Sequence, residues 1–269
     1  MKEKEGKENI GGIVVIVNDV GSYFELIPQH EHARIAALFL EHWKDPALYN
    51  GKRWNELLFA VRHHDRAWIP LDAEPLLDSH SKPYSFIDYP ENEKINAYEN
   101  GIEDVTDKDL YSGLLVSRHY ASFFESSQTA TGRTFLQSER KRQDNIRKEL
   151  HYPHTEEFHM KVLQFCDDIS LYVCMNNPGA AKNEEVTWFK NGFRQRFIFL
   201  NNKKIHAHFH TNDTINIEPF PLFSNLEVTI NGTIIQKQKL VEKGIKKTYR
   251  DGKPCARQFR FVSSNTTGS

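Results

Sequence analysis

The sequence predicts an α+β fold: a mainly helical bundle flanked by an N-terminal β-hairpin and a C-terminal β-rich region. Apolar residues recur with helical spacing from residue 28 to about residue 175. Residues 185–262 instead form short strand-like runs, which Asn-Asn, Asn-Asp, Asn-Gly and Asp-Gly dipeptides separate. The two patterns place helices in the middle of the chain and strands at both ends.

The N-terminal hairpin is predicted from two β-rich runs, IVVIV and YFELI, on either side of Asn18-Asp19-Val20-Gly21. Asn, Asp and Gly supply the turn that such a pair of strands needs. The low-complexity character of both chain ends predicts disordered tails. The predicted segments are a tail at 1–11, the hairpin and bundle at 12–178, a β-rich region packed on them at 179–262, and a tail at 263–269.

A long connection from residue 69 to residue 106 interrupts the helical pattern. Its four prolines stand among several aromatic residues, and a connection of this length is unusual in a compact domain. It could be a moving lid or an ordered surface segment held by its aromatic side chains. Because loops with many prolines are stiff, we favour the ordered segment.

Composition excludes several classes of protein. The 269 residues include 35 Lys and Arg against 36 Asp and Glu, a formal charge of −1, whereas a dedicated nucleic-acid binder usually has a strong basic excess. The longest aliphatic runs are too short to cross a bilayer, and the charged start lacks the apolar core of a signal peptide. The three cysteines form no C-x-x-C pair. We expect a cytoplasmic protein with reduced thiols, no membrane partner and a small-molecule ligand; a homo-oligomer is left open.

The first helix, QHEHARIAALFLEHW, turns one histidine inward. Steps of three and four residues from His32 follow an apolar stripe that ends at Trp43. The same steps from His30 reach Arg34 and Glu41, so His30 lies on the wetter face. The alternative for His32 is a core histidine whose polar atoms a backbone carbonyl satisfies.

The second helix, WNELLFAVRHHD, ends in His64 and Asp65, which continue its buried stripe. A carboxylate beside an imidazole at the edge of a core is unfavourable unless it is paired or bound to a metal. This requirement favours a functional site at the His64-Asp65 pair.

Two later helices each add a candidate ligand. In TDKDLYSGLLVSRHYASFF, His119 shares a face with apolar and aromatic residues and points inward. In TEEFHMKVLQFCDDISLYVC, Asp168 flanks the stripe that includes Phe165 and Ile169, whereas Asp167 lies on the opposite side, where we expect it to be solvated. Asp168 is therefore the predicted ligand of this helix.

Four helices thus direct ligand-type side chains toward one core. Nitrogen and carboxylate ligands suit a divalent metal, namely Mn²⁺, Fe²⁺, Zn²⁺ or Mg²⁺. A metal with open coordination positions polarises water toward hydroxide near neutral pH, which is the chemistry of hydrolysis. The predicted metal-binding residues are His32, His64, Asp65, His119 and Asp168.

The order of these residues resembles the HD-domain superfamily of metal-dependent phosphohydrolases, in which a His, a His-Asp pair and a distant Asp stand on successive helices. The chain is also similar to a small uncharacterised bacterial family at the edge of that superfamily, through QHEHARIA, AVRHHDRAW, LLVSRHYASFF, LQFCDDISLYVC and INIEPFPLF. The resemblance implies an HD-like helical bundle and metal ligands at His32, His64, Asp65 and Asp168.

The resemblance also implies a reaction, in which a metal-activated water attacks a phosphoester or a nucleotide. Asp65 would bind the metal and accept a proton, and His119 would hold a second metal or orient the leaving phosphate. Arg66 and Arg118 could stabilise charge on the phosphate, although arginines at helix ends are equally expected as solvated charge. Some catalytic members have a further His or Glu directly after the His-Asp pair, where this chain has Arg66.

Two rival functions stay open. One is a non-catalytic metal- or ligand-binding module in which any metal is structural. The other is a helical pocket that binds an organic cofactor without a metal.

Two remaining polar segments have simpler interpretations. His206, His208 and His210 alternate in a predicted strand and so share one face, but such spacing spreads three ligands over about 13 Å, which favours a polar strand face over a zinc site. The basic segment SERKRQDNIRKEL also contains acidic residues, so we interpret it as a solvated helix and not as a nucleic-acid surface.

Overall fold

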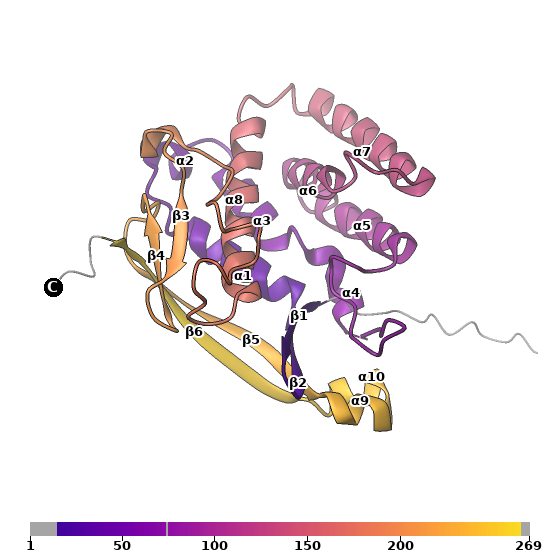
Figure 1. Ribbon diagram of the computed structural model, residues 1–269. Coiled ribbons are helices and arrows are strands. Elements are labelled where there is room, and N and C mark those ends of the chain that lie inside the picture. Colours follow the sequence, from indigo (N-terminus) through magenta and orange to yellow (C-terminus); the bar gives the residue numbers. More distant parts are fainter. Residues whose placement is uncertain (1–14, 74, 265–269) are drawn as a thin grey trace, which may run out of the picture.

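The chain combines a helical bundle with a curved sheet that runs along one side of it (Figure 1). This computed structural model describes residues 15–73 and 75–264. The sheet has six strands in the order β1-β2-β5-β6-β4-β3, and all neighbours are antiparallel except β4 and β6. The strands are β1 (Val15–Val20), β2 (Tyr23–Pro28), β3 (His206–Phe209), β4 (Thr214–Glu218), β5 (Leu226–Gln236) and β6 (Lys253–Ser263).

Most helices lie between β2 and β3 in the chain, so the predicted mixture of central helices and terminal strands is confirmed. The α-helices are α1 (Gln29–Glu41), α2 (Pro46–Tyr49), α3 (Trp54–His63), α4 (Ile69–Asp72), α5 (Glu91–Thr106), α6 (Leu110–Ser122), α7 (Ala130–Glu149), α8 (Glu156–Met175), α9 (Lys237–Lys243) and α10 (Ile245–Arg250). Two short 3₁₀ helices are η1 (Arg66–Trp68) and η2 (Ile198–Leu200).

The N-terminal hairpin is confirmed, with its turn later than the sequence suggests. Val20 pairs with Tyr23, so Gly21 and Ser22 form a two-residue loop, and Gly21 adopts the positive φ of 60° that such loops favour. Asn18 stays in β1 because its side chain donates hydrogen bonds to Glu25 on β2 and to a carbonyl of α8. The first two residues of the predicted IVVIV strand lie outside the described residues.

The hairpin belongs to the same sheet as the C-terminal strands, because β2 pairs with β5. The predicted division at residues 178 and 179 therefore does not separate the β elements of the fold. The predicted tail at 1–11 lies outside the described residues. Of the predicted tail at 263–269, Ser263 still belongs to β6, and residues 265–269 lie outside the described residues. One sheet beside the bundle thus contains strands from both ends of the described chain.

The predicted long connection is shorter than expected, because residues 91–106 form α5. The irregular part that remains is held by aromatic contacts, as the ordered alternative requires: the Tyr89 ring lies 6.0 Å from Trp68 and 5.9 Å from Tyr84, measured between ring centroids. Tyr89 is almost fully buried. This segment forms an ordered wall beside η1 and α5.

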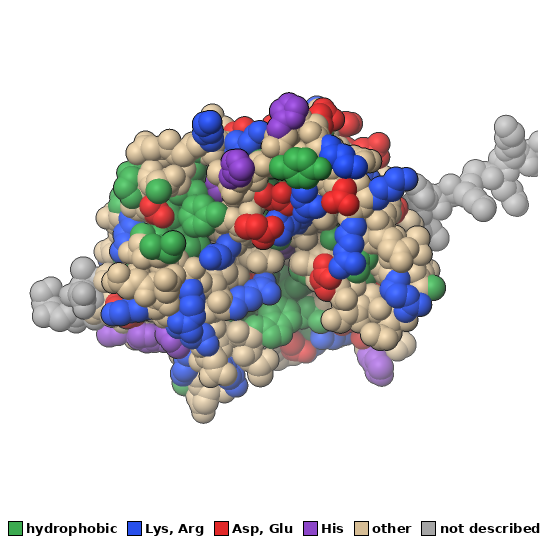
Figure 2. All heavy atoms as spheres, turned by 90° about the horizontal axis from the view of Figure 1, so that it is seen from above, with side chains coloured by type: hydrophobic (Ala, Val, Ile, Leu, Met, Phe, Trp, Pro, Cys, Tyr) green, Lys and Arg blue, Asp and Glu red, His purple; other side chains and the backbone are tan. Residues whose placement is uncertain are grey.

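The surface helix α7 is amphipathic, as predicted for SERKRQDNIRKEL: Phe135, Leu136 and Ile146 are buried, and most of its charged residues are exposed. Acidic and basic side chains are intermingled on the face seen in Figure 2. None of the helices in the described part of the chain has the length and apolar character that crossing a bilayer requires.

Helix α8 is the centre of the bundle. It packs against α1, α3, α6 and β1, so most of its residues are buried and not one stripe alone. Phe165 occupies the middle of an aromatic group, with ring centroids 5.3–5.9 Å from those of Phe39, Trp43, Phe193 and Phe197. This group fixes α8 to α1 and to the segment that precedes β3.

Replacing Phe165 by Ala should lower the free energy of unfolding by about 3–5 kcal/mol, because the change removes a fully buried ring and leaves a cavity. Urea unfolding followed by circular dichroism measures the change. The control Ile198→Ala, at a side chain that is 85% exposed, should change stability by less than about 0.5 kcal/mol. Equal effects of the two variants would contradict the central place given to α8.

Candidate metal centre

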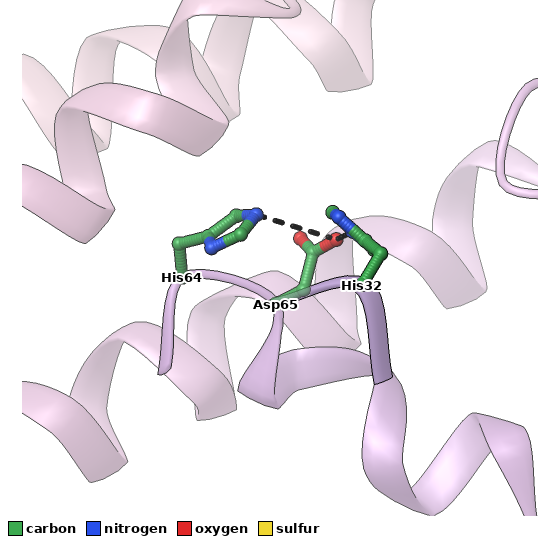
Figure 3. A group of neighbouring side chains, drawn as sticks. All are labelled: His32, His64 and Asp65. Carbon is green, nitrogen blue, oxygen red and sulfur yellow. Dashed lines mark hydrogen bonds and ion pairs between the residues drawn. The ribbon is translucent and has the colours of Figure 1, made fainter. Parts of the chain in front are cut away.

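Five buried imidazole and carboxylate side chains meet where α1, α3, α6 and α8 pack together. His32 lies on α1, and His64 with Asp65 follows the last turn of α3. The ligand atoms of these three residues all lie within 4.8 Å of one another, and Figure 3 shows Asp65 between the two rings. His64 also forms a second group of the same kind with His119 on α6 and Asp167 on α8. Four helices therefore build one continuous cluster, as the sequence predicts.

The orientation of His32 is fixed by a hydroxyl group. The Ser170 Oγ donates its only proton to the Asp167 carbonyl at 2.8 Å, so toward the His32 Nδ1, at 2.9 Å, it can act only as acceptor. His32 therefore carries a proton on Nδ1 and turns Nε2 toward the Asp65 Oδ2 at 2.6 Å. At this distance the His32 Nε2 and the Asp65 carboxylate must share a proton, or both must contact a cation.

His64 has the same orientation for a different reason. Its Nδ1 lies 2.7 Å from the carbonyl of Val61 and must donate to it. Its Nε2 is buried and lies 3.4 Å from the Asp167 Oδ1 and 3.9 Å from the Asp65 Oδ2, without a hydrogen-bond partner among the described residues. Metal-ligating histidines typically donate the other ring N–H to such an acceptor, which fixes the ring and leaves Nε2 for the ion.

The charges in the cluster are strongly coupled. Burial disfavours a charged His64, but the carboxylates of Asp65 and Asp167 outweigh this effect and raise the pKa of the imidazole to about 9. Burial also disfavours the charged carboxylates, yet the neighbouring imidazoles lower the pKa of both Asp65 and Asp167. Both acids therefore stay ionised at neutral pH, and the imidazole of His64 is protonated.

His119 differs from the other two histidines. Burial lowers its pKa to about 4 despite the nearby carboxylates, so the ring is neutral at pH 7. Its centroid lies 5.0 Å from that of His64, and its buried Nδ1 has no hydrogen-bond partner within the described chain. The His64 Nε2 has no hydrogen-bond partner within the described chain, and the neutral His119 ring lies in the same cluster. Together with the carboxylates of Asp65 and Asp167, these groups fit a divalent ion of the Mn²⁺, Fe²⁺, Zn²⁺ or Mg²⁺ type.

The structure corrects the choice between the two adjacent aspartates. Asp167, which the sequence analysis places in solvent, is buried among the histidines, and Asp168 instead accepts hydrogen bonds from Gln195 at 2.8 Å and Arg194 at 3.3 Å. The error has a physical cause: α8 is buried on several faces, so its Phe165 stripe is not the only one. A second stripe on the face of Asp167 was visible in the sequence, namely Met160, Leu163, Ser170 and Cys174.

A cavity of about 570 Å³ opens directly onto the cluster. His32, Asp65, His119 and Asp167 form part of its wall. Aromatic side chains supply much of the remainder: Trp68, Phe86, Tyr98, Phe123, Trp188, Phe189 and Phe193. This volume is in the range of small-molecule sites, and a wall that combines aromatic side chains with convergent polar groups is typical of them.

The two arginines expected to contact phosphate lie elsewhere. Arg66 pairs with Asp104 at 3.2 Å, and Arg118 pairs with Glu156 and Glu157 at 2.6 and 2.7 Å; neither lines the cavity. Because His119 faces inward, its neighbour Arg118 is turned away toward the start of α8. The cations at the cavity are Lys94 and Arg194, and no spacing pattern in the sequence marks either of them.

The alternating histidines of the C-terminal region form a polar strand face, as favoured. His206 and His208 on the edge strand β3, and His210 just after it, are exposed, while the intervening Ala207 is buried. The clusters able to hold a metal in the described chain are both at the helical site.

The family model that matches this chain is described as a protein of unknown function (DUF3891) and covers residues 15–237. The match spans well over half of the chain, which therefore belongs to this family. Comparison with curated proteins and with solved structures gives no match. The chemistry of the site is thus the basis for a functional proposal.

Asp167→Asn should weaken Mn²⁺ binding by about 100-fold or more, because the change removes one of the two carboxylates that the cluster could offer to the ion. Asp168→Asn is the matched control and should change the affinity by less than about threefold, because its carboxylate bonds Gln195 and Arg194. Calorimetric titration of chelator-treated protein measures both. If Asp168→Asn weakens Mn²⁺ binding more than Asp167→Asn does, the ligand is Asp168 and not Asp167.

Metal binding should release protons, because an ion at Nε2 replaces the proton that a pKa of about 9 keeps on His64. Apparent affinity should therefore rise by up to about tenfold per pH unit between pH 6 and 8 for each proton released. The raised pKa of His64 also increases the free energy of unfolding of the metal-free protein. This contribution is fully present below 6.5, the pKa of His64 in the unfolded chain, and is lost as the pH rises through about 9. Calorimetry in buffers of different ionisation enthalpy counts the protons, and affinity that does not vary with pH would refute the assignment.

Proposed function

We propose that this protein is a metal-dependent phosphohydrolase of the HD-domain type, acting on a small phosphorylated molecule such as a nucleotide. The observation that carries the proposal is the shared orientation of His32 and His64. Each donates its Nδ1–H to a protein oxygen, the Ser170 hydroxyl or the Val61 carbonyl, and turns Nε2 to a buried carboxylate at the wall of the 570 Å³ cavity. A core histidine serving packing alone has no need of this arrangement.

His32, His64, Asp65 and Asp167 hold a divalent ion, and His119 completes its shell or holds a second ion. When bound, the ion supplies Lewis acidity toward water and phosphate oxygen. Asp65 and Asp167 stay ionised because the imidazoles lower the pKa of both, so they can retain the ion and accept a hydrogen bond from a water molecule.

Two cations support an anionic substrate. Lys94 lies on α5 one turn before Tyr98, and both line the cavity. Lys94 is half-buried, its pKa is lowered by burial, and its ammonium group has no hydrogen bond or ion pair within the described residues. Arg194 is held at the cavity by its ion pair with Asp168. A phosphate at the metal would lie within a wall that carries both charges.

Access to the cluster favours catalysis over a purely structural metal. Structural sites are closed by protein ligands, whereas catalytic sites keep an open position. Here His32, Asp65, His119 and Asp167 all contribute to the surface of the cavity, so a substrate could reach an ion at the cluster.

We expect the Mn²⁺-loaded protein to hydrolyse a phosphomonoester or a nucleotide, and we expect a chelator to stop this hydrolysis. Asp65→Asn should lower turnover by about 100-fold or more, because it removes a ligand and the charge that holds the ion. A His206→Ala and His208→Ala double variant, altered only on the exposed strand face, should keep wild-type turnover.

A panel of phosphomonoesters, phosphodiesters and nucleotides, assayed by phosphate release with Mn²⁺, Fe²⁺ and Mg²⁺, measures these activities. If the metal binds, chelation lowers the melting temperature and no member of the panel is hydrolysed, the metal is structural and the hydrolase proposal is wrong.

A further inference from the structure

The side chain of Gln29 is a buried polar group without a partner. Gln29 is the first residue of α1, its side chain is fully buried, and neither Nε2 nor Oε1 has a hydrogen-bond partner among the described residues. Buried amide groups are normally paired, because leaving both ends unpaired costs free energy. Gln29 is also one of the residues that line the cavity of about 570 Å³, so a ligand there lies beside a buried carboxamide that no described residue satisfies.

The position of Gln29 relative to the cluster is fixed by the helix. Gln29 and His32 are three residues apart on α1, which places them on one face, and both line the cavity. The backbone N–H of Gln29 donates to the buried Asp72 Oδ2 at 2.8 Å, which fixes the first turn of α1. The two residues therefore stand about one helical turn apart, roughly 5 Å along the helix axis.

The unpaired atoms define what a ligand must offer. Nε2 needs an acceptor and Oε1 needs a donor. A phosphate dianion offers acceptors only, so it can satisfy Nε2 but not Oε1. A hydroxyl group offers both, and the aromatic side chains of the cavity, such as Trp188 and Phe123, provide a surface for a flat organic group.

We propose that Gln29 is a specificity-determining residue that binds a hydroxyl group of an organic phosphate, close to its phosphate group, while the aromatic wall covers a flat ring of the same molecule. The substrate class is a hydroxyl-bearing phosphate ester with a planar ring. The place of the phosphate rests on the proposed function, whereas the hydroxyl contact rests on Gln29 and the cavity.

The test compares two ligands that differ only in their hydroxyls: adenosine 5′-monophosphate and its 2′,3′-dideoxy analogue. Calorimetric titration of the Mn²⁺-loaded full chain should show about tenfold tighter binding of the hydroxylated ligand. Gln29→Met, which keeps the length of the side chain and removes both polar atoms, should abolish this preference and leave the affinity for the dideoxy analogue unchanged.

Stability provides a second readout that does not depend on activity. Gln29→Met should raise the melting temperature of the ligand-free protein by about 2–4 °C, because it removes two unpaired buried polar atoms. Gln143→Met is the matched control: Gln143 donates to the Ser117 Oγ at 3.0 Å, so its loss should lower the melting temperature and leave the ligand preference intact.

Hydrolysis is measured on the same samples and separates two failures. Binding that prefers the hydroxylated ligand and depends on Gln29, but without turnover, supports this inference and contradicts the hydrolase. Turnover of both ligands with equal affinity, a preference that survives in Gln29→Met, or no binding of either ligand would overturn the role of Gln29.

Discussion

Asp65 and Asp167 are carboxylates buried at the junction of four helices, and their need for positive charge is the constraint on which the site depends. A buried carboxylate is strongly destabilising unless a proton, an imidazolium or a metal compensates it. Three imidazoles from α1, α6 and the end of α3 surround the two acids, and the serine on α8 and a carbonyl of α3 fix two of those rings. The same contacts that join the helices thus orient ligand atoms toward one point.

The sheet and the aromatic core lie outside the cluster and hold its helices in place. The hairpin and the C-terminal strands close around α1 and α8, and the rings about Phe165 attach α8 to the segment before β3. That segment also carries Trp188, Phe193 and Arg194 to the cavity. The α+β order and the helices that carry the cluster could be predicted from local periodicity, because each depends on neighbours in sequence. Helix α5, within the predicted connection, and helices α9 and α10, within the predicted β-rich region, were missed. The pairing of β2 with β5 could not be predicted, because a contact between residues so far apart leaves no local pattern.

The candidate ligands show the same limit at the level of single side chains. His32, His64, Asp65 and His119 could be predicted to face inward because each continues a series of apolar residues at helical spacing in its own segment. Asp167 and Asp168 were exchanged because α8 is buried on more than one side, and a single-stripe analysis cannot rank two adjacent acids on such a helix. Gln29 and Lys94 could not be predicted as site residues, because the cavity that they line forms only when segments distant in sequence pack together.

The most direct measurement of the central claim is anomalous diffraction from crystals of the untagged protein grown with Mn²⁺. We predict a strong anomalous peak in the cluster, at about 2.0–2.4 Å from the Nε2 of His32 and of His64 and from a carboxylate oxygen of Asp65 or Asp167. A cluster without such a peak, in crystals whose Mn²⁺ lies elsewhere, for example at His206 and His208 of the exposed strand, would contradict the metal centre and the proposal that rests on it.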